Sequence, residues 1–212
     1  CWWRRQMESF RRVREIPGVE VVLGMTLSQM NVDHFPTAFA AAAKKIPGLT
    51  YQDFHVNIVH ESSHYLGNDE LGLRDHVAPT MLLESVKEVA RLRGLPRGPV
   101  GYLEGQYLDR VERYLMTGKT PMRCHALSAS CFVDSWGNVF PCTIYDRKIG
   151  SLRDVDYDLR QIWSTPLAED TQKEIWKADC PQCWTPCEAY QSIMGNFLVP
   201  GRELGGSEPS LE

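Results

Sequence analysis

Six of the seven cysteines lie between positions 124 and 187, and this crowding constrains the fold more than any other feature of the sequence. Three of them fall within 180-CPQCWTPC-187. Two cysteines with two residues between them can direct both sulfurs at one centre from a single turn, which suits zinc and iron–sulfur sites. Buried structural thiols are the alternative, because free cysteine is among the most buried residue types. The odd total, with Cys1 far from the rest, argues against a complete disulfide framework.

The composition is typical of a globular protein, with 212 residues, 43% of them apolar and 24% charged. A net charge of -4 predicts no nucleic-acid partner, because nucleic-acid binding needs a basic face. No apolar run approaches the roughly 20 residues that span a bilayer, and the N-terminal residues lack the apolar centre of a signal peptide. We therefore expect a cytoplasmic protein in a reducing compartment, with no membrane association.

The first half of the sequence alternates between helical and strand patterns. In order, the patterns predict a helix at 2–15, a buried strand at 19–26, a helix at 35–45, a strand at 53–59 and a helix at 81–93. This order is typical of a parallel sheet covered by helices, that is, an α/β fold. Two parallel strands do not make a stable sheet, and the chain begins inside a helix without Met. We therefore expect a C-terminal fragment of a longer protein.

The second half leads into a cysteine-rich α+β module of one hairpin and several helices. Within it, 131-CFVDSWGNVFPC-142 predicts the hairpin, whose turn contains Gly137, a residue that tolerates positive φ. The other expected elements are a Pro/Gly linker at 94–101, a helix at about 103–116, and short helices at 159–163 and 166–177.

The cysteine module favours an iron–sulfur cluster over zinc. A structural zinc site is closed by four ligands, fewer than the six cysteines present. The module also contains many aromatic residues, including Trp184 within the knuckle, and apolar walls suit a cluster that must be shielded from water. The alternative function is a non-enzymatic structural or interaction module that binds zinc.

The pattern Cys124-x12-Gly137-x4-Cys142, followed by Cys180-x2-Cys183-x3-Cys187, resembles the SPASM/twitch extension of radical S-adenosylmethionine enzymes. The neighbouring runs 137-GNVFPC-142, 149-IGSLRD-154 and 161-QIW-163 agree with it. More loosely, the first half is similar to the last third of the radical SAM partial barrel. The resemblance implies this organisation: the C-terminal part of a parallel (β/α) partial barrel at 1–100, a connecting helix at 101–120, the iron–sulfur module at 121–200 and a disordered tail at 201–212.

The resemblance also implies a parent enzyme that cleaves S-adenosylmethionine with a [4Fe-4S] cluster held by a CxxxCxxC motif. This motif is absent from the 212 residues, so we expect the chain alone to be inactive. The shortened cysteine pattern implies one auxiliary [4Fe-4S] cluster, which would transfer electrons if closed by four thiolates and bind substrate if open. A peptide, protein or small-molecule substrate and a flavodoxin or ferredoxin reductant are the expected partners.

The expected ligands of the auxiliary cluster are Cys124, Cys142, Cys180 and Cys183. Cys187 is the rival for the fourth position. Cys131, in the predicted hairpin strand, is as well explained by a packed thiol as by a ligand. His125, next to Cys124, is interpreted as a surface residue, with a proton carrier as the alternative.

Polar residues follow both predicted strands, at the edge where parallel barrels place their active sites. Four of them are candidates for binding S-adenosylmethionine or substrate: Thr26, Ser28, Asn31 and Asn57. His60, Glu61 and Ser62 also follow the second strand. For Asn31 and Asp33, capping of the following helix is the alternative. His55 lies in mid-strand and is interpreted as a core histidine.

Overall fold

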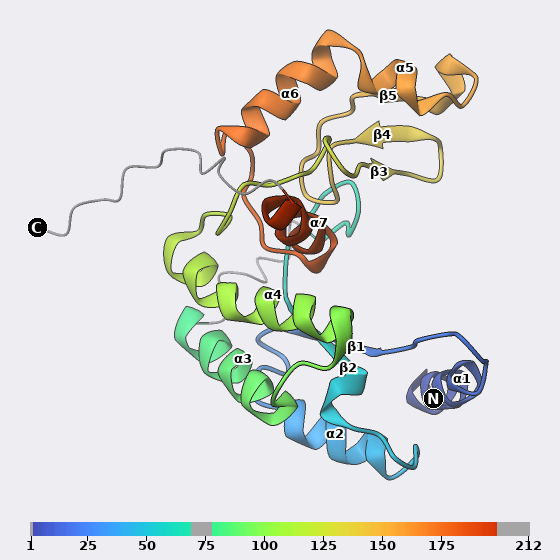
Figure 1. Cartoon of the computed structure of the whole chain (residues 1–212), viewed down its shortest axis with the longest axis vertical. Helices are drawn as coiled ribbons and strands as arrows, with labels where there is room; N and C mark the ends of the chain where they lie inside the picture. Colours follow the sequence, from blue (N-terminus) through green and yellow to red (C-terminus); the bar gives the residue numbers. More distant parts are fainter. Residues whose placement is uncertain (1, 69–77, 199–212) are drawn as a thin grey trace, which may run out of the picture. The chain divides into compact units, whose positions relative to one another are not determined.

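The computed structural model describes residues 2–68 and 78–198 (Figure 1). The chain divides into two compact units. Unit 1 combines Cys1–Glu61 with Asn68–Met116, and unit 2 combines Ser62–Gly67 with Thr117–Glu212. The predicted tail at 201–212 lies outside the described residues. In the described part of the chain, no helix has the length and apolar character needed to cross a bilayer.

Unit 1 contains every element predicted for the first half of the chain. Its elements are α1 (Trp2–Arg14), β1 (Leu23–Leu27), α2 (Phe35–Ala43), the 3-10 helix η1 (Tyr51–Asp53), β2 (Phe54–Ile58), α3 (Pro79–Arg93) and α4 (Gly98–Thr117). The two strands pair in parallel, with Leu23 opposite Phe54 and Leu27 opposite Ile58. The fold is therefore mixed α/β with a parallel strand pair.

The prediction of a fully buried strand at 19–26 is wrong. The strand begins only at Leu23, and the side chains of Val19 and Val22 before it are exposed. Within β1, burial alternates and becomes complete only at Leu27. The physical reason is that β1 pairs with β2 alone among the described residues, so the preceding valines have no neighbouring strand to bury them.

The free edge of β2 is closed by side chains of α4. The backbone N–H of Val56 donates to Glu104 Oε1 at 3.2 Å, and that of Ile58 donates to the Tyr107 hydroxyl at 3.4 Å. A helix that covers a strand edge in this way satisfies donors that would otherwise pair with another strand. The predicted linker at 94–101 is partly helical, because α4 begins at Gly98, and Pro99 suits a first helical turn.

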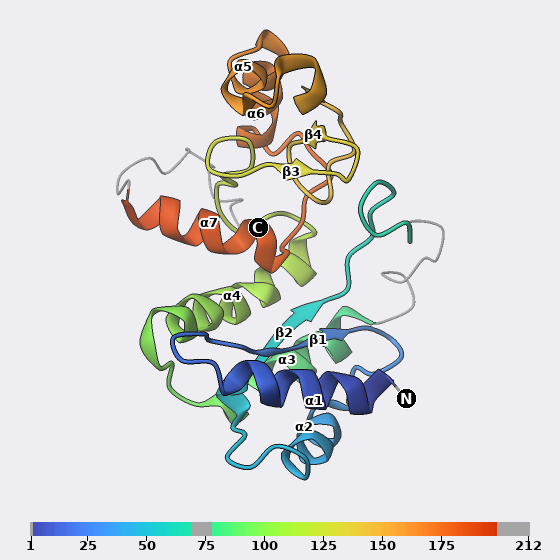
Figure 2. The same cartoon turned by 90° about the vertical axis from the view of Figure 1, so that its right-hand side faces the viewer.

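Unit 2 contains the predicted hairpin and two predicted helices. Its elements are β3 (Phe132–Val133), β4 (Asn138–Phe140), β5 (Gly150–Ser151), the 3-10 helix η3 (Leu152–Val155), α5 (Leu159–Trp163), α6 (Pro166–Trp176) and α7 (Pro186–Leu198). Gly137 has the expected positive φ of 86°. The sequence interpretation did not include β5, which adds a third antiparallel strand, or α7, which is seen end-on in Figure 1 and from the side in Figure 2.

Thiols are part of the apolar core of unit 2. Cys142 belongs to a buried cluster with Leu127, Val139 and Ile175, among other residues. Cys124, Cys131 and Cys180 pack against the same cluster from its margin. The core of unit 2 therefore gathers cysteines from segments that are far apart in the sequence.

Candidate metal centre

Three separate segments of unit 2 carry the four cysteines that the spacing predicts as ligands. Cys124 follows α4, Cys142 follows β4, and Cys180 and Cys183 follow α6. After α6 the chain reverses through Ala178 and Gln182, whose φ values of 61° and 55° lie in the left-handed region. Non-glycine residues adopt this conformation only where the surrounding structure holds them.

Side-chain hydrogen bonds of Gln182 hold this turn in place. Its Nε2 donates to the Ala178 carbonyl at 2.7 Å and to Cys180 Sγ at 3.1 Å, while its Oε1 accepts from the Thr120 N–H at 3.0 Å. The Thr120 hydroxyl in turn donates to the Cys183 carbonyl at 3.0 Å. The knuckle is thus fixed both within itself and to the segment that precedes Cys124.

Two of the four cysteines accept a hydrogen bond from the backbone N–H two residues further along: Cys124 Sγ from Ala126 at 3.4 Å and Cys142 Sγ from Ile144 at 3.4 Å. At Cys180 and Cys183, burial raises the thiol pKa, and the backbone N–H groups of Gln182 and Thr185 act in the opposite direction. Tyr145 N adds a second bond to Cys142 Sγ at 3.2 Å. Such donors stabilise negative charge on sulfur, and they are among the groups that tune iron–sulfur clusters.

The same four thiols are electrostatic neighbours. Cys180 raises the pKa of Cys124, Cys124 raises that of Cys142, and both Cys142 and Cys124 raise that of Cys183. Burial is the larger cause in every case, and it brings the pKa of Cys124 and of Cys142 to about 12. The metal-free protein therefore holds neutral thiols here, and a bound metal must displace their protons.

Cys131 and Cys187 differ from these four. After burial, the electrostatic neighbour that raises the pKa of each is Glu188 rather than another thiol. Cys187 is exposed in the first turn of α7, and Cys131 is half-buried just before β3. Among the described residues, no three His, Cys, Asp or Glu side chains already converge tightly enough to hold one metal ion. Cys124, Cys142, Cys180 and Cys183 are thus linked by mutual effects on their pKa values, whereas the packing around the apolar core also includes Cys131.

Two polar residues of this region were missed by sequence reasoning. Glu188 is buried, and its carboxylate accepts a hydrogen bond from the Ser130 hydroxyl at 3.2 Å. Burial raises its pKa to about 7. Thr185 is also buried, and its hydroxyl has no hydrogen-bond partner in the described structure. The sequence signal was 185-TPCE-188, a capping-box pattern with Pro at the first helical position.

The predicted strand-end residues of unit 1 divide into two kinds. Asn31 is used locally, since its Oδ1 accepts from the Ser28 N–H at 2.9 Å and its Nδ2 donates to the Thr26 carbonyl at 3.0 Å. Asn57 lies opposite Thr26 in the strand pair, and its buried Oδ1 has no hydrogen-bond partner among the described residues. Asn57 is therefore the candidate whose polar group is left for a ligand.

The alternative that Asn31 or Asp33 caps the following helix is wrong. The N-cap of α2 is His34, and it makes no side-chain capping bond. Asn31 instead closes the turn at 28–31, where the Asn31 N–H donates to the Ser28 carbonyl at 3.1 Å. Pro36, in the first turn of α2, lacks the N–H that a cap would satisfy.

His55 and His60 form hydrogen bonds within the fold of unit 1. His55 Nδ1 donates to Glu104 Oε2 at 2.8 Å, which fits the interpretation of a core histidine. His60 is buried, donates from Nδ1 to the Ile58 carbonyl at 2.9 Å and stacks with Tyr114. His125 is half-buried rather than at the surface.

The ring of His125 lies against Gly195 of α7, where a Cβ atom on residue 195 would come within 2.6 Å of the ring.

Glu61 is half-buried at the end of the first segment of unit 1. Ser62, by contrast, belongs to unit 2, where its hydroxyl donates to the Thr143 carbonyl at 2.6 Å.

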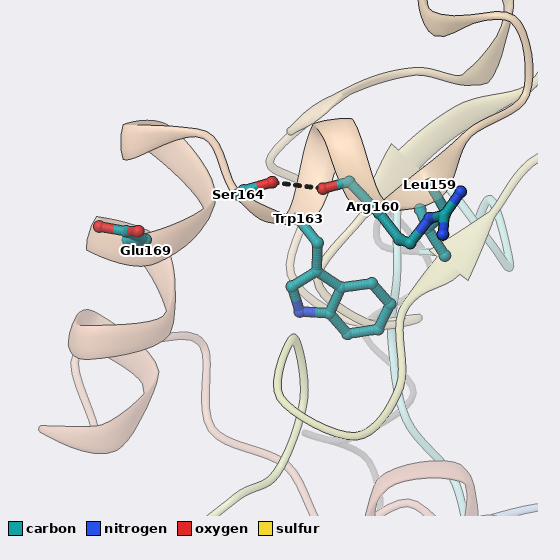
Figure 3. A pocket seen from close by; sticks show the side chains of 5 residues that line it. All are labelled: Leu159, Arg160, Trp163, Ser164 and Glu169. Atoms are coloured by element: carbon teal, nitrogen blue, oxygen red, sulfur yellow. Dashed lines mark hydrogen bonds between the residues drawn. The ribbon is translucent and has the colours of Figure 1, made fainter.

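An open hollow of about 530 Å³ lies between α5 and α6, away from the cysteines. Leu159, Arg160, Trp163, Ser164 and Glu169 line it. Figure 3 shows the Trp163 ring at its centre, with Arg160 and Glu169 on opposite sides. The indole N–H donates to the Leu127 carbonyl, so the ring is fixed as part of the fold of unit 2.

Comparison with known protein families gives one match, to the SPASM iron–sulfur cluster-binding domain, over residues 124–184. The matched range includes Cys124, Cys142, Cys180 and Cys183, and it ends before Cys187. No curated protein and no solved structure matches the chain. The match supports iron–sulfur cluster binding by the part of the chain that contains the four grouped thiols.

Proposed function

We propose that the chain is part of a radical S-adenosylmethionine enzyme and that Cys124, Cys142, Cys180 and Cys183 hold one auxiliary [4Fe-4S] cluster. The observation that carries this proposal is the mutual electrostatic influence of these four thiols, together with the backbone N–H groups that donate to Cys124 and Cys142. The donor set fits the group, because iron–sulfur clusters are held by four thiolates and tuned by hydrogen bonds to sulfur. The match to the SPASM domain over 124–184 agrees with the assignment.

When bound, the cluster supplies a one-electron carrier, and the four-thiolate set favours electron transfer over substrate binding. The chain itself positions the sulfurs and limits water. Cys142 and Cys183 are buried, and Trp184 beside them is 1% exposed. We propose a peptide, protein or small-molecule substrate and a flavodoxin or ferredoxin as the reductant.

Anaerobic reconstitution of the full chain with iron and sulfide tests the cluster. We expect a brown protein with about four irons and four sulfides per chain and a broad thiolate-to-iron absorption band. A colourless protein that binds one zinc instead would contradict the proposal and favour a structural zinc module.

The two edges of the strand pair in unit 1 are consistent with the proposal that this unit is part of a barrel. The β2 edge is closed by Glu104 and Tyr107, so further strands could join the sheet only at β1. The unpartnered Asn57 Oδ1 at the carboxyl end of β2 favours a ligand there, and we propose S-adenosylmethionine, with Thr26, Ser28 and Asn31 framing the site.

The chain has no CxxxCxxC motif, so the radical-generating cluster of the proposed enzyme must come from residues outside these 212. We expect no 5′-deoxyadenosine when the reconstituted chain is incubated with S-adenosylmethionine and dithionite. Clear turnover, measured by chromatography, would contradict this part of the proposal.

A further inference from the structure

The Cys142 ligand lies in a segment, residues 141–149, that forms neither helix nor strand. Backbone carbonyl groups in such a segment have no ladder to pair them, so their partners must come from elsewhere. The carbonyls of Cys142 and Thr143 accept hydrogen bonds from residues of the segment 62–67. This segment is far away in the sequence but belongs to the same compact unit.

The segment 62–67 reaches the Cys142 region through three consecutive side chains. The hydrogen bonds run from Ser62 Oγ to the Thr143 carbonyl at 2.6 Å, from Ser63 Oγ to Asp146 Oδ2 at 2.7 Å, and from His64 Nε2 to the Cys142 carbonyl at 3.1 Å. Because a carbonyl oxygen only accepts, Nε2 of His64 carries the proton. The side chain of His64 is 7% exposed, so this bond is shielded from water.

Aromatic contacts add to these hydrogen bonds. The His64 ring stacks on Phe140 with a centroid separation of 4.6 Å, and Tyr65 packs edge-on against Phe132 at 5.0 Å. Phe132 and Phe140 are cross-strand partners in the β3–β4 hairpin. His64 therefore contacts both the hairpin that leads into Cys142 and the peptide group of Cys142 itself.

We propose that residues 62–67 clamp the Cys142 segment and that His64 is a positioning residue for the Cys142 ligand. The proposal rests on the proposed function, since it takes Cys142 as a cluster ligand. The bond from His64 fixes the peptide plane that follows Cys142. The next two amides, of Ile144 and Tyr145, are those that donate to Cys142 Sγ. Loss of the clamp would loosen these N–H···S bonds without removing any ligand.

Three single variants of the full chain separate the parts of the clamp. His64→Phe keeps an aromatic ring against Phe140 but removes the donor. His64→Gln keeps an N–H donor near the position of Nε2 but removes the ring. Ser63→Ala is the matched control, because it deletes an exposed hydrogen bond of the same segment.

The first measurement is amide hydrogen exchange on the metal-free chain. We expect exchange at Ile144 and Tyr145 to be about tenfold faster in His64→Phe, as for loss of one buried hydrogen bond. His64→Gln should recover part of the protection, and Ser63→Ala should match the unchanged chain. Faster exchange spread evenly over unit 2 would show a general loss of stability and overturn the clamp.

The second measurement is the midpoint potential and electron paramagnetic resonance spectrum of the reconstituted chain. Weaker N–H···S bonds stabilise the reduced cluster less, so His64→Phe should shift the potential to more negative values and broaden the spectrum. The unchanged chain could bind iron while His64→Phe shows the same amide exchange rates and the same potential as the unchanged chain. This result would contradict the clamp but leave the proposed cluster intact. If the unchanged chain binds no iron, the proposed function fails, and amide exchange alone decides whether the clamp exists.

Discussion

Glu104 in unit 1 and Glu188 in unit 2 are both buried, yet the two units treat their carboxylates differently. Glu104 accepts hydrogen bonds from His55 Nδ1 at 2.8 Å and from the Val56 N–H at 3.2 Å. Glu188 accepts one from the Ser130 hydroxyl at 3.2 Å and otherwise faces thiols. Burial of a carboxylate is costly unless hydrogen bonds replace its water. In unit 1, two hydrogen bonds offset the cost of burying the Glu104 carboxylate. In unit 2, the single hydrogen bond to Glu188 offsets only part of the corresponding cost.

The contrast is weaker for other polar groups. In unit 1, Asn31 Oδ1 and Nδ2 each make a hydrogen bond within one turn, but the buried Asn57 Oδ1 has no partner among the described residues. In unit 2, the buried hydroxyl of Thr185 has no partner in the described structure. The clear difference between the units therefore lies in the two buried carboxylates, since Glu104 accepts two hydrogen bonds and Glu188 accepts one.

The largest expected effect separates the two kinds of thiol in unit 2. Cys142→Ala or Cys183→Ala should abolish most iron binding after reconstitution, because each removes a buried thiol of the proposed ligand set. Cys131→Ala and Cys187→Ala are the matched controls and should bind iron like the unchanged chain. Iron and sulfide analysis of all four variants decides this. A loss of iron in Cys187→Ala with retention in Cys142→Ala would reverse the assignment.

The next effect tests unit 1. Glu104→Ala removes the acceptor for two donors, His55 Nδ1–H and the Val56 N–H, at about 1–3 kcal/mol each, so the free energy of unfolding should fall by about 2–6 kcal/mol. Glu112→Ala on the same helix is the control, because its ion pair with Lys87 is exposed. Urea denaturation measures both variants. Equal stability of the two variants would mean that the edge of β2 does not depend on Glu104.

Many elements of both units could be predicted from the sequence. Apolar periodicity located α1, α3 and α4, the alanine-rich run located α2, and the hairpin followed from Gly137 between two short apolar runs. The spacing of the cysteines predicted an iron–sulfur module, in agreement with the match to the SPASM domain over residues 124–184, whereas the choice of four ligands stays a prediction. Local patterns report these features because each depends on residues close together in the chain.

The features that the sequence did not predict depend on long-range contacts. The exposure of Val19 and Val22 follows from the absence of a second strand partner for β1 among the described residues. The attachment of residues 62–67 to the Cys142 segment joins residues about 80 positions apart, which no periodicity reveals. Helix α7 could have been predicted, because 185-TPCE-188 is a capping-box pattern.

The third prediction concerns the pH dependence of Glu188 in the metal-free chain. Burial raises its pKa from 4.5 to about 7, so the folded state binds its proton more tightly than the unfolded state. Below about pH 4.5 the group is protonated in both states and has no effect. Between pH 4.5 and 7 stability falls as pH rises, and above pH 7 the full penalty of about 3 kcal/mol applies.

Glu188→Gln removes this penalty. The variant should match the unchanged chain at pH 4, below the unfolded pKa, and exceed its free energy of unfolding at pH 8 by about 3 kcal/mol. Glu169→Gln, an exposed substitution on α6, should show the same pH dependence as the unchanged chain. Parallel stability curves for the unchanged chain and Glu188→Gln would mean that Glu188 finds partners for its charge, as Glu104 does.

The smallest effect distinguishes two buried threonines of unit 2 by the same substitution. The Thr171 hydroxyl donates to the Leu167 carbonyl at 2.7 Å, so Thr171→Val should lower the free energy of unfolding by about 1 kcal/mol. The Thr185 hydroxyl has no partner, so Thr185→Val removes a desolvated group and should raise it by up to about 1 kcal/mol. Valine keeps the branched shape in both places, and urea denaturation of the metal-free chain measures the difference. The opposite signs of the two stability changes are the essential result, because Thr185 lies at the start of α7, where a threonine normally stabilises a helix by capping it.

An equal loss of stability in Thr185→Val and Thr171→Val would show that the Thr185 hydroxyl caps α7. The contrast between the two units would then depend on Glu188 alone.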